Sequence, residues 1–270
     1  MTGKITSEFK RVDNGGIEII FTIPGNLIIS TKNDALKEFA KTAVISGFRK
    51  GMAPIAKVEA ITNDEKLTEH ILSHLLPQTF SESVIEYKFN SAIYPKYEAI
   101  KITSSKNVST ETEWQIKAIT CELQKVILPK NYKGKLKRDQ KDQTILIKSL
   151  IEVVRLEIPK MLVDEEVNAR LSQVLERIEK LGLTLEGYLK SVGKTAETLR
   201  AEYEIQAKEA ISMELILNEV ANQEKIEVTE KEIDEFIKTT GEDLNKVEKN
   251  QRNILKRVIL RRSALDKLSK

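Results

Sequence analysis

The hydrophobic residues at the start of the chain alternate with polar residues. Ile5 and Phe9 share one face of a period-two segment, and a second apolar run follows at 17–23. Between the two segments, residues 13–16 read Asp-Asn-Gly-Gly, which tolerate the positive φ angles of a tight turn. Two alternating segments joined in this way predict a β-hairpin.

The spacing of apolar residues then becomes helical. We expect one helix at about 27–44 and another that begins after a cap at Asn63-Asp64 and runs to about Phe89. Pro77 lies inside the second helical segment. It is predicted to bend or interrupt that helix, because proline removes a helical hydrogen bond.

The rest of the chain divides into three parts. Two β-type segments, near 91–102 and 111–127, complete a predicted α+β domain over residues 1–127. The next segment, 128–142, is basic, poor in core residues and broken by proline and glycine, which predicts a linker. Residues 143–270 have a helical period throughout and are predicted to form an all-α domain. We expect an elongated, helix-rich molecule.

Start and stop signals divide the helical part into separate helices. Asp164 and Thr195 precede apolar stripes with a 3.6-residue period and are predicted N-caps, and Gly182 is a predicted stop. Thr229 and the glutamate three residues later match a capping box. The last helix is expected at about 243–268.

Composition narrows the class of protein. Aromatic residues make up only 5% of the chain, which disfavours a deep small-molecule pocket. Cys121 is the only cysteine, so neither an internal disulfide nor a cysteine-based zinc site is expected. The first residues lack a signal peptide and no segment has the apolar length of a membrane span. We therefore expect a cytoplasmic protein with no membrane partner.

The net charge of +3 conceals three bands along the chain. Residues 125–148 hold eight Lys or Arg against two Asp, and residues 246–270 hold nine basic against two acidic residues. Between them, residues 149–245 hold 12 basic and 22 acidic residues. Such banding suits an elongated molecule with distinct faces, and solubility alone explains any single band equally well.

Residues 47–54 read Gly-Phe-Arg-Lys-Gly-Met-Ala-Pro. Two glycines allow sharp turns, and the residues between them can present a forked cation, a point charge and an aromatic anchor. The segment resembles the ribosome-docking signature of bacterial trigger factor, Gly-Phe-Arg-x-Gly-x-x-Pro. The resemblance assigns ribosome binding to Gly47, Phe48, Arg49, Lys50, Gly51 and Pro54.

A second resemblance lies in the helical part. Ile158-Pro159 with the run at 162–167 looks like the start of the same family's C-terminal domain, and so does 219–221 followed by 224–229. The resemblance implies a SurA-like helical domain. It also implies an ATP-independent chaperone without a cofactor that binds nascent polypeptides near the exit tunnel. The implied partners are exit-tunnel proteins, ribosomal RNA and unfolded chains. Whether the protein forms a homodimer when it is off the ribosome is left open.

Two departures from the family pattern matter. Trigger factors usually carry an FK506-binding-type prolyl isomerase domain between these two parts, whereas here the segment 131–137 passes directly into the helical part. We therefore predict that the protein is not an enzyme and has no catalytic residues. Met52 stands where the family commonly has lysine, which removes one cation from the loop.

His70 and His74 are four residues apart, a spacing that can bind zinc on one helical face. The motif His-Glu-x-x-His is absent and the chain has no third histidine, so no metal site is predicted. Client-binding residues cannot be assigned from the pattern. Two alternative functions stay open: a ribosome-independent holdase, and an RNA-binding factor that uses the basic bands at 125–148 and 246–270.

Overall fold

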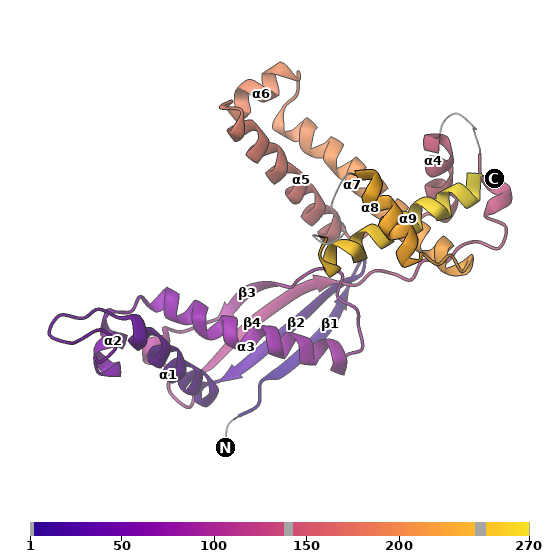
Figure 1. Ribbon diagram of the computed structural model, residues 1–270. Helices are drawn as coiled ribbons and strands as arrows, with labels where there is room; N and C mark the ends of the chain where they lie inside the picture. Colours follow the sequence, from indigo (N-terminus) through magenta and orange to yellow (C-terminus); the bar gives the residue numbers. More distant parts are fainter. Residues whose placement is uncertain (1–2, 138–142, 241–246, 270) are drawn as a thin grey trace. The chain divides into compact units, whose positions relative to one another are not determined.

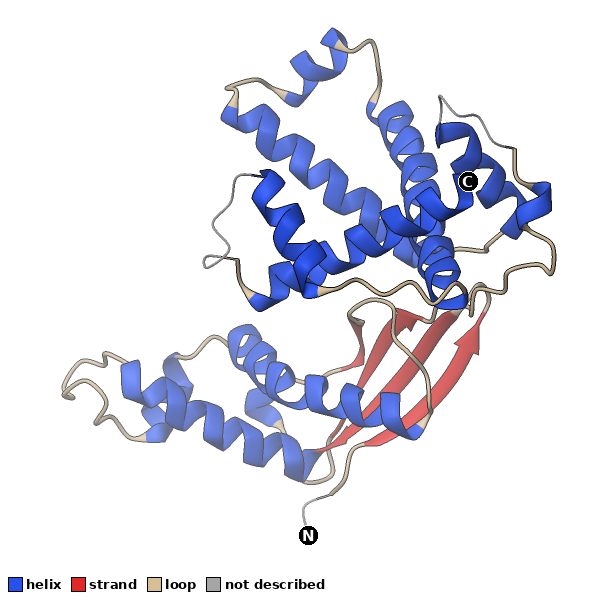
Figure 2. Cartoon of the chain, turned by 45° about the vertical axis from the view of Figure 1, so that its right-hand side comes forward, coloured by secondary structure: helices blue, strands red, loops and turns tan. Residues whose placement is uncertain are grey.

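The computed structural model describes residues 3–137, 143–240 and 247–269. These residues form two compact units, Met1–Leu123 and Gln124–Lys270, drawn in Figures 1 and 2. The first unit combines a small sheet with helices, and the second is helical. None of the helices in the described ranges has the length and apolar character of a membrane span.

The sheet of the first unit has four antiparallel strands in the order β1-β2-β4-β3. The strands are β1 (Thr6–Val12), β2 (Gly16–Pro24), β3 (Lys96–Lys101) and β4 (Glu113–Cys121). β1 and β2 pair from Thr6↔Thr22 to Val12↔Gly16. Asn14 and Gly15 both adopt positive φ in the turn between them. This confirms the predicted hairpin.

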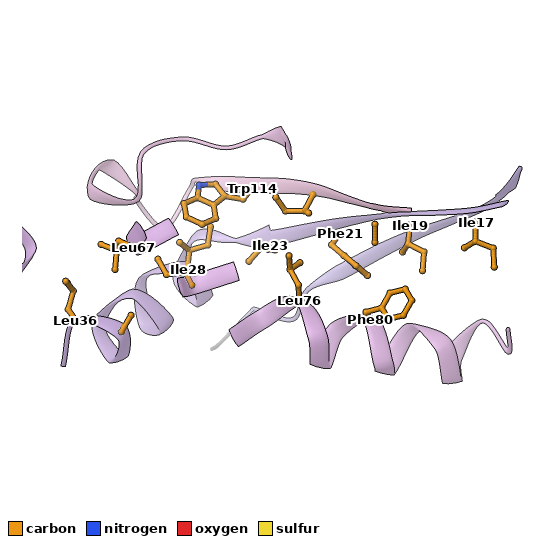
Figure 3. Packing of buried hydrophobic residues seen from close by; sticks show 14 of the residues in the cluster. Ile17, Ile19, Phe21, Ile23, Ile28, Leu36, Leu67, Leu76, Phe80 and Trp114 are labelled. Atoms are coloured by element: carbon orange, nitrogen blue, oxygen red, sulfur yellow. The ribbon is translucent and has the colours of Figure 1, made fainter. Parts of the chain in front are cut away.

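One face of this sheet carries the core of the unit. Alternate residues of β2 and β4 are buried because successive strand residues point to opposite faces. The buried side chains on this face are Ile17, Ile19, Phe21, Ile23, Trp114, Ile116 and Ala118. Leu76 and Phe80 of α3 (Asp64–Glu86) pack against it (Figure 3).

Helix α3 begins at its predicted cap. The Asn63 side chain accepts hydrogen bonds from the backbone N–H groups of Glu65, at 2.7 Å, and Lys66, at 3.2 Å. The helix continues through Pro77, so the expected interruption does not occur. Leu76 and Phe80 are buried on either side of that proline, and their packing on the sheet offsets the missing hydrogen bond.

The two later strands are shorter than predicted. β3 begins at Lys96 rather than near Ser91, because Pro95 has no N–H to donate to a ladder. Ser91 makes only an isolated bridge to Glu122. β4 ends at Cys121, and the residues after it belong to the second unit from Gln124 onward.

The helices of the second unit pack around α7. They are α4 (Gln143–Val154), α5 (Lys160–Lys180), α6 (Leu185–Ser191), α7 (Ala196–Gln223), α8 (Glu230–Thr240) and α9 (Lys249–Ser269). α4, α5 and α9 all contact α7. The predicted start of the last helix, 243–246, lies outside the described residues.

Three of the four helix signals in this unit are confirmed. Thr195 caps α7, Gly182 ends α5 with a φ of 67°, and Thr229 and Glu232 exchange the hydrogen bonds of a capping box. Asp164 is not a cap, because α5 starts earlier, with Pro159 at its N-cap position. Proline favours a helix start, where its missing N–H is not needed.

The segment predicted as a linker is packed rather than free. In its described part, 128–137, the side chains of Leu128, Tyr132 and Leu136 are buried with residues of α4, α7 and α9. These apolar residues recur at every fourth position and pack on the helices. The basic side chains between them give the segment the composition of a linker. Residues 138–142 lie outside the described residues.

Candidate functional site

The glycine-bracketed segment 47–54 lies in the loop between α1 (Gly25–Thr42) and α2 (Ile55–Ile61). In both ribbon views the loop extends beyond the two helices, away from the sheet of its own unit (Figures 1 and 2). We call residues 43–54 the signature loop.

Two consecutive turns of the same kind shape the signature loop. Phe48 N–H donates to the Ile45 carbonyl at 3.0 Å, and Met52 N–H donates to the Arg49 carbonyl at 2.9 Å. The third residue of each turn is a glycine with positive φ, 84° at Gly47 and 81° at Gly51, and the residue before each glycine has a negative φ. This is the pattern of a type II turn, which requires positive φ at that position. Because the glycines are four residues apart, the same type of turn occurs twice in succession.

The side chains between the glycines point outward. Phe48 is 41% exposed, and Arg49 and Lys50 are exposed as well. Within the described residues, neither cation has an ion-pair partner. Pro54 is exposed and occupies the N-cap position of α2. The loop thus presents a partly exposed aromatic ring and two exposed cations without ion-pair partners in the described part of the chain.

The ends of the signature loop are anchored while its centre is exposed. Ala43 and Ile45 pack against the core cluster on one side, and Ala53 and Val58 are buried in it on the other. Anchoring both ends fixes the position of the exposed residues between them. Loop residues held on a rigid scaffold in this way are common in binding sites.

Sequence reasoning missed part of the apolar surface of the signature loop. Val44, inside the helix predicted at 27–44, is 79% exposed because α1 ends at Thr42 and Ala43 is extended. Met52 is 72% exposed. No periodicity marks either residue as exposed, since the end of α1 depends on the turn that follows it. Together with Phe48 they make the loop more apolar than its signature indicates.

A second candidate surface lies on the helical unit. α5 and α7 pack through Val163, Val167 and Ala207 to form an arm, and α6 joins their far ends (Figure 1). Exposed apolar side chains gather at and near that end: Leu175, Leu181, Leu183, Leu185 and Val192. Exposed apolar side chains that lie together in this way make the end of the arm a candidate interaction surface.

The remaining chemical groups are also placed. Cys121 is completely buried in β4, as expected for a core thiol. His70 and His74 lie on α3 beside Glu38 of α1, and the three residues offer ligand atoms within 4.8 Å of one another. The third side chain of this group is a carboxylate 32 positions before His70, which no local motif could indicate.

Comparison with known proteins identifies both halves of the chain. A family model described as "Bacterial trigger factor protein (TF)" matches residues 5–145, and one described as its C-terminus matches residues 122–270. The two matches overlap, so no segment between them is unmatched. A solved structure of the trigger factor chaperone, described by its promiscuous substrate recognition in folding and assembly, covers 97% of this chain. The superposition also includes 99% of the chain in that structure, with a TM-score of 0.64 and 12% sequence identity. The two chains therefore share a fold.

Curated relatives agree with this. The trigger factor of Hydrogenovibrio crunogenus is 27% identical over 203 residues, 74% of this chain and 43% of that protein. That of Listeria welshimeri is 33% identical over 103 residues, 38% of this chain and 24% of that protein. The chain therefore spans less than half the length of these relatives. Each family model covers more than half of the chain, and on that ground the protein belongs to the bacterial trigger factor family.

Proposed function

We propose that this protein is a ribosome-associated, nucleotide-independent chaperone that holds nascent polypeptides in the cytoplasm. The observation that carries the proposal is the pair of equal turns at Gly47 and Gly51, which directs Phe48, Arg49 and Lys50 away from the fold. Membership of the trigger factor family supports the same function.

The exposed groups of the signature loop suit a mixed surface of RNA and protein. Arg49 can bind a phosphate or carboxylate with two parallel hydrogen bonds, and Lys50 acts as a point charge. Phe48 adds an apolar anchor of the kind that dominates interface energies. Because phosphate contacts release counterions, we expect docking to weaken as salt rises.

Met52 shifts the balance of these contacts. It replaces a cation common in the family with an apolar side chain that is 72% exposed. We therefore propose that docking relies more on apolar contact and less on charge than in relatives with lysine there. The salt dependence should be correspondingly shallower, since one fewer counterion is released.

The helical unit is proposed to hold the client. The exposed leucines at the far end of the arm form an apolar surface that a disordered chain could cover at many registers. Holding of this kind involves no bond making or breaking. The two matched family regions overlap without an isomerase segment between them, which supports a non-enzymatic role.

Co-sedimentation with ribosomes tests the proposal. The combined variant Phe48→Ala, Arg49→Ala and Lys50→Ala should lose ribosome binding while its circular dichroism and unfolding temperature stay unchanged. A matched control removes one exposed aromatic and two exposed lysines elsewhere in the same unit: Tyr94→Ala, Lys101→Ala and Lys106→Ala. Ribosome binding that survives in the loop variant, or is lost equally in the control, would refute docking through the loop.

Structural observations bear on the two alternatives. A buried Phe48 would favour a ribosome-independent holdase. In the structure, Phe48 is 41% exposed. An RNA-binding surface needs free cations in the basic bands, but several there pair with carboxylates: Lys133 and Lys267 with Glu224, Arg252 with Glu230 and Asp234, and Arg261 with Glu214. Equal affinity for naked RNA and for ribosomes would favour the RNA alternative.

A further inference from the structure

Two helices of the first unit bring together three metal-ligand side chains. His70 and His74 lie one turn apart on α3, and Glu38 faces them from α1. We propose that these residues form a binding site for a divalent transition-metal ion, with Zn²⁺ as the representative ion. The site lies outside the residues proposed for ribosome docking and is independent of that proposal.

The distances match those of a metal site that is close to assembled. His70 Nε2 lies 3.3 Å from Glu38 Oε2. Two ligands bound about 2.0–2.1 Å from a tetrahedral zinc ion are about 3.4 Å apart, so this pair needs almost no movement. The His70 and His74 ring centroids are 4.7 Å apart, and a ligand atom of each of the three residues lies within 4.8 Å of the others. Small side-chain rotations would bring the third ligand within reach.

The donor set selects the class of ion. Two imidazole nitrogens and one carboxylate oxygen suit Zn²⁺ and its neighbours Co²⁺, Ni²⁺ and Cu²⁺. Mg²⁺ and Ca²⁺ prefer oxygen ligands and should not compete. Three protein ligands leave the fourth position of a tetrahedral ion for water.

The surroundings of His70 hold one ligand in place. Its ring packs edge-on against Phe39 with centroids 4.7 Å apart, and its side chain is only 25% exposed. Its Nδ1 atom is buried and has no hydrogen-bond partner among the described residues. Histidine ligands in strong sites usually donate their second N–H to a partner. We therefore expect a site that binds its ion less tightly than sites with such a partner.

A bound ion would link α1 to α3 close to the signature loop. Glu38 lies one helical turn before Thr42, where α1 ends and the loop begins. In the metal-free protein, the two helices are joined here by the contact between His70 Nε2 and Glu38 Oε2 at 3.3 Å. A metal ion would replace that contact with bonds from both helices to one ion.

The test is a titration of the whole chain with ZnCl₂ after removal of metal with a chelator, followed by calorimetry. We expect one ion per chain, and visible absorption bands of tetrahedral coordination when Co²⁺ is used instead. His74→Ala and Glu38→Gln should each weaken binding at least about tenfold, because even loss of an outer-shell partner costs that much. Glu38 is 51% exposed and His74 is exposed, so these substitutions should leave the fold intact.

Glu69→Gln is the matched control. Glu69 precedes His70 on α3 but lines a different hollow, which it shares with Thr68 and Tyr97. Zn²⁺ affinity should be unchanged in this variant. Zn²⁺ should also raise the unfolding temperature of the parent protein but not that of His74→Ala, because only a folded-state ligand stabilises by binding. The proposal is overturned if the parent protein binds no Zn²⁺, or if His74→Ala and Glu38→Gln bind it as tightly as the parent.

Discussion

Lys32 of α1 and Glu59 of α2 form an ion pair that holds the two helices together on either side of the signature loop. The Lys32 Nζ–Glu59 Oε1 distance is 3.1 Å, and the Lys32 side chain is only 11% exposed. Because one helix precedes the loop and the other follows it, this pair constrains both ends. A lysine so well buried depends on its partner, since a buried charge without one is costly.

Glu59→Gln should therefore lower the free energy of unfolding by about 1–3 kcal/mol, because it leaves Lys32 buried without its countercharge. Urea unfolding measures the loss. The control is Asp34→Asn, which removes the exposed pair between Asp34 and Lys37, whose side chains are 70% and 61% exposed. That loss should stay below about 0.5 kcal/mol. Equal losses in the two variants would show that burial does not matter here.

Gly47→Ala and Gly51→Ala should each cost about 1 kcal/mol of stability, because alanine is strained at positive φ. The two losses should be similar, because a Cβ at Gly51 would make only an ordinary contact with the Lys41 carbonyl oxygen, at 3.4 Å, and a Cβ at Gly47 would face open space. Both should also weaken ribosome co-sedimentation by distorting the turns. Gly193→Ala, with the same type of strain and open space in the helical unit, should lose stability but still bind ribosomes.

A hydrogen bond from Lys133, and a second one from Lys267 with a smaller effect, lower the pKa of Glu224 below its ordinary value of 4.5. The unfolded chain binds this proton more readily, so the contribution of Glu224 to stability is complete above about pH 4.5 and is lost as pH falls through the lower folded pKa. Glu224→Gln should accordingly be less stable than the parent at pH 7, and the difference should disappear in acid. Urea unfolding at a series of pH values measures this.

Glu186→Gln serves as the control for the pH series. It removes an exposed pair within α6, in which the Glu186 and Lys190 side chains are 79% and 76% exposed. Its stability should stay close to that of the parent at every pH. A Glu224 difference that persists undiminished at pH 2 would rule out the carboxylate as its source.

Leu181→Ser with Leu183→Ser should weaken client binding roughly fivefold or more, because covering an exposed leucine contributes about 1 kcal/mol. The two side chains are 67% and 53% exposed, so stability should change little. Light scattering during refolding of an aggregation-prone client measures the effect. Ile85→Ser, at a 76% exposed position on α3, should leave aggregation suppression unchanged. Equal loss in that variant would argue against a specific surface on the arm.

Turns and caps that depend on nearby residues are predictable from the sequence, whereas features that depend on distant residues are not. The hairpin turn at Asn14-Gly15 and the cap at Asn63 depend on backbone preferences and hydrogen bonds within four residues, so the sequence indicates them directly. Asp164 failed as a cap although its residue type is suitable, because Pro159 starts the helix earlier. The burial of Tyr132 is not apparent from the sequence, because it depends on helices far along the chain.

By itself, the sequence determined the α+β and all-α halves, most of the turns and caps, and the loop from Gly47 to Pro54, since all of these follow from short-range preferences. Only the tertiary structure showed that the loop contains the same type of turn twice and that both of its ends pack against the core. It alone also placed Glu38 beside His70 and His74. Packing between helices sets such contacts, and packing depends on side chains separated by tens of residues, which no local pattern records.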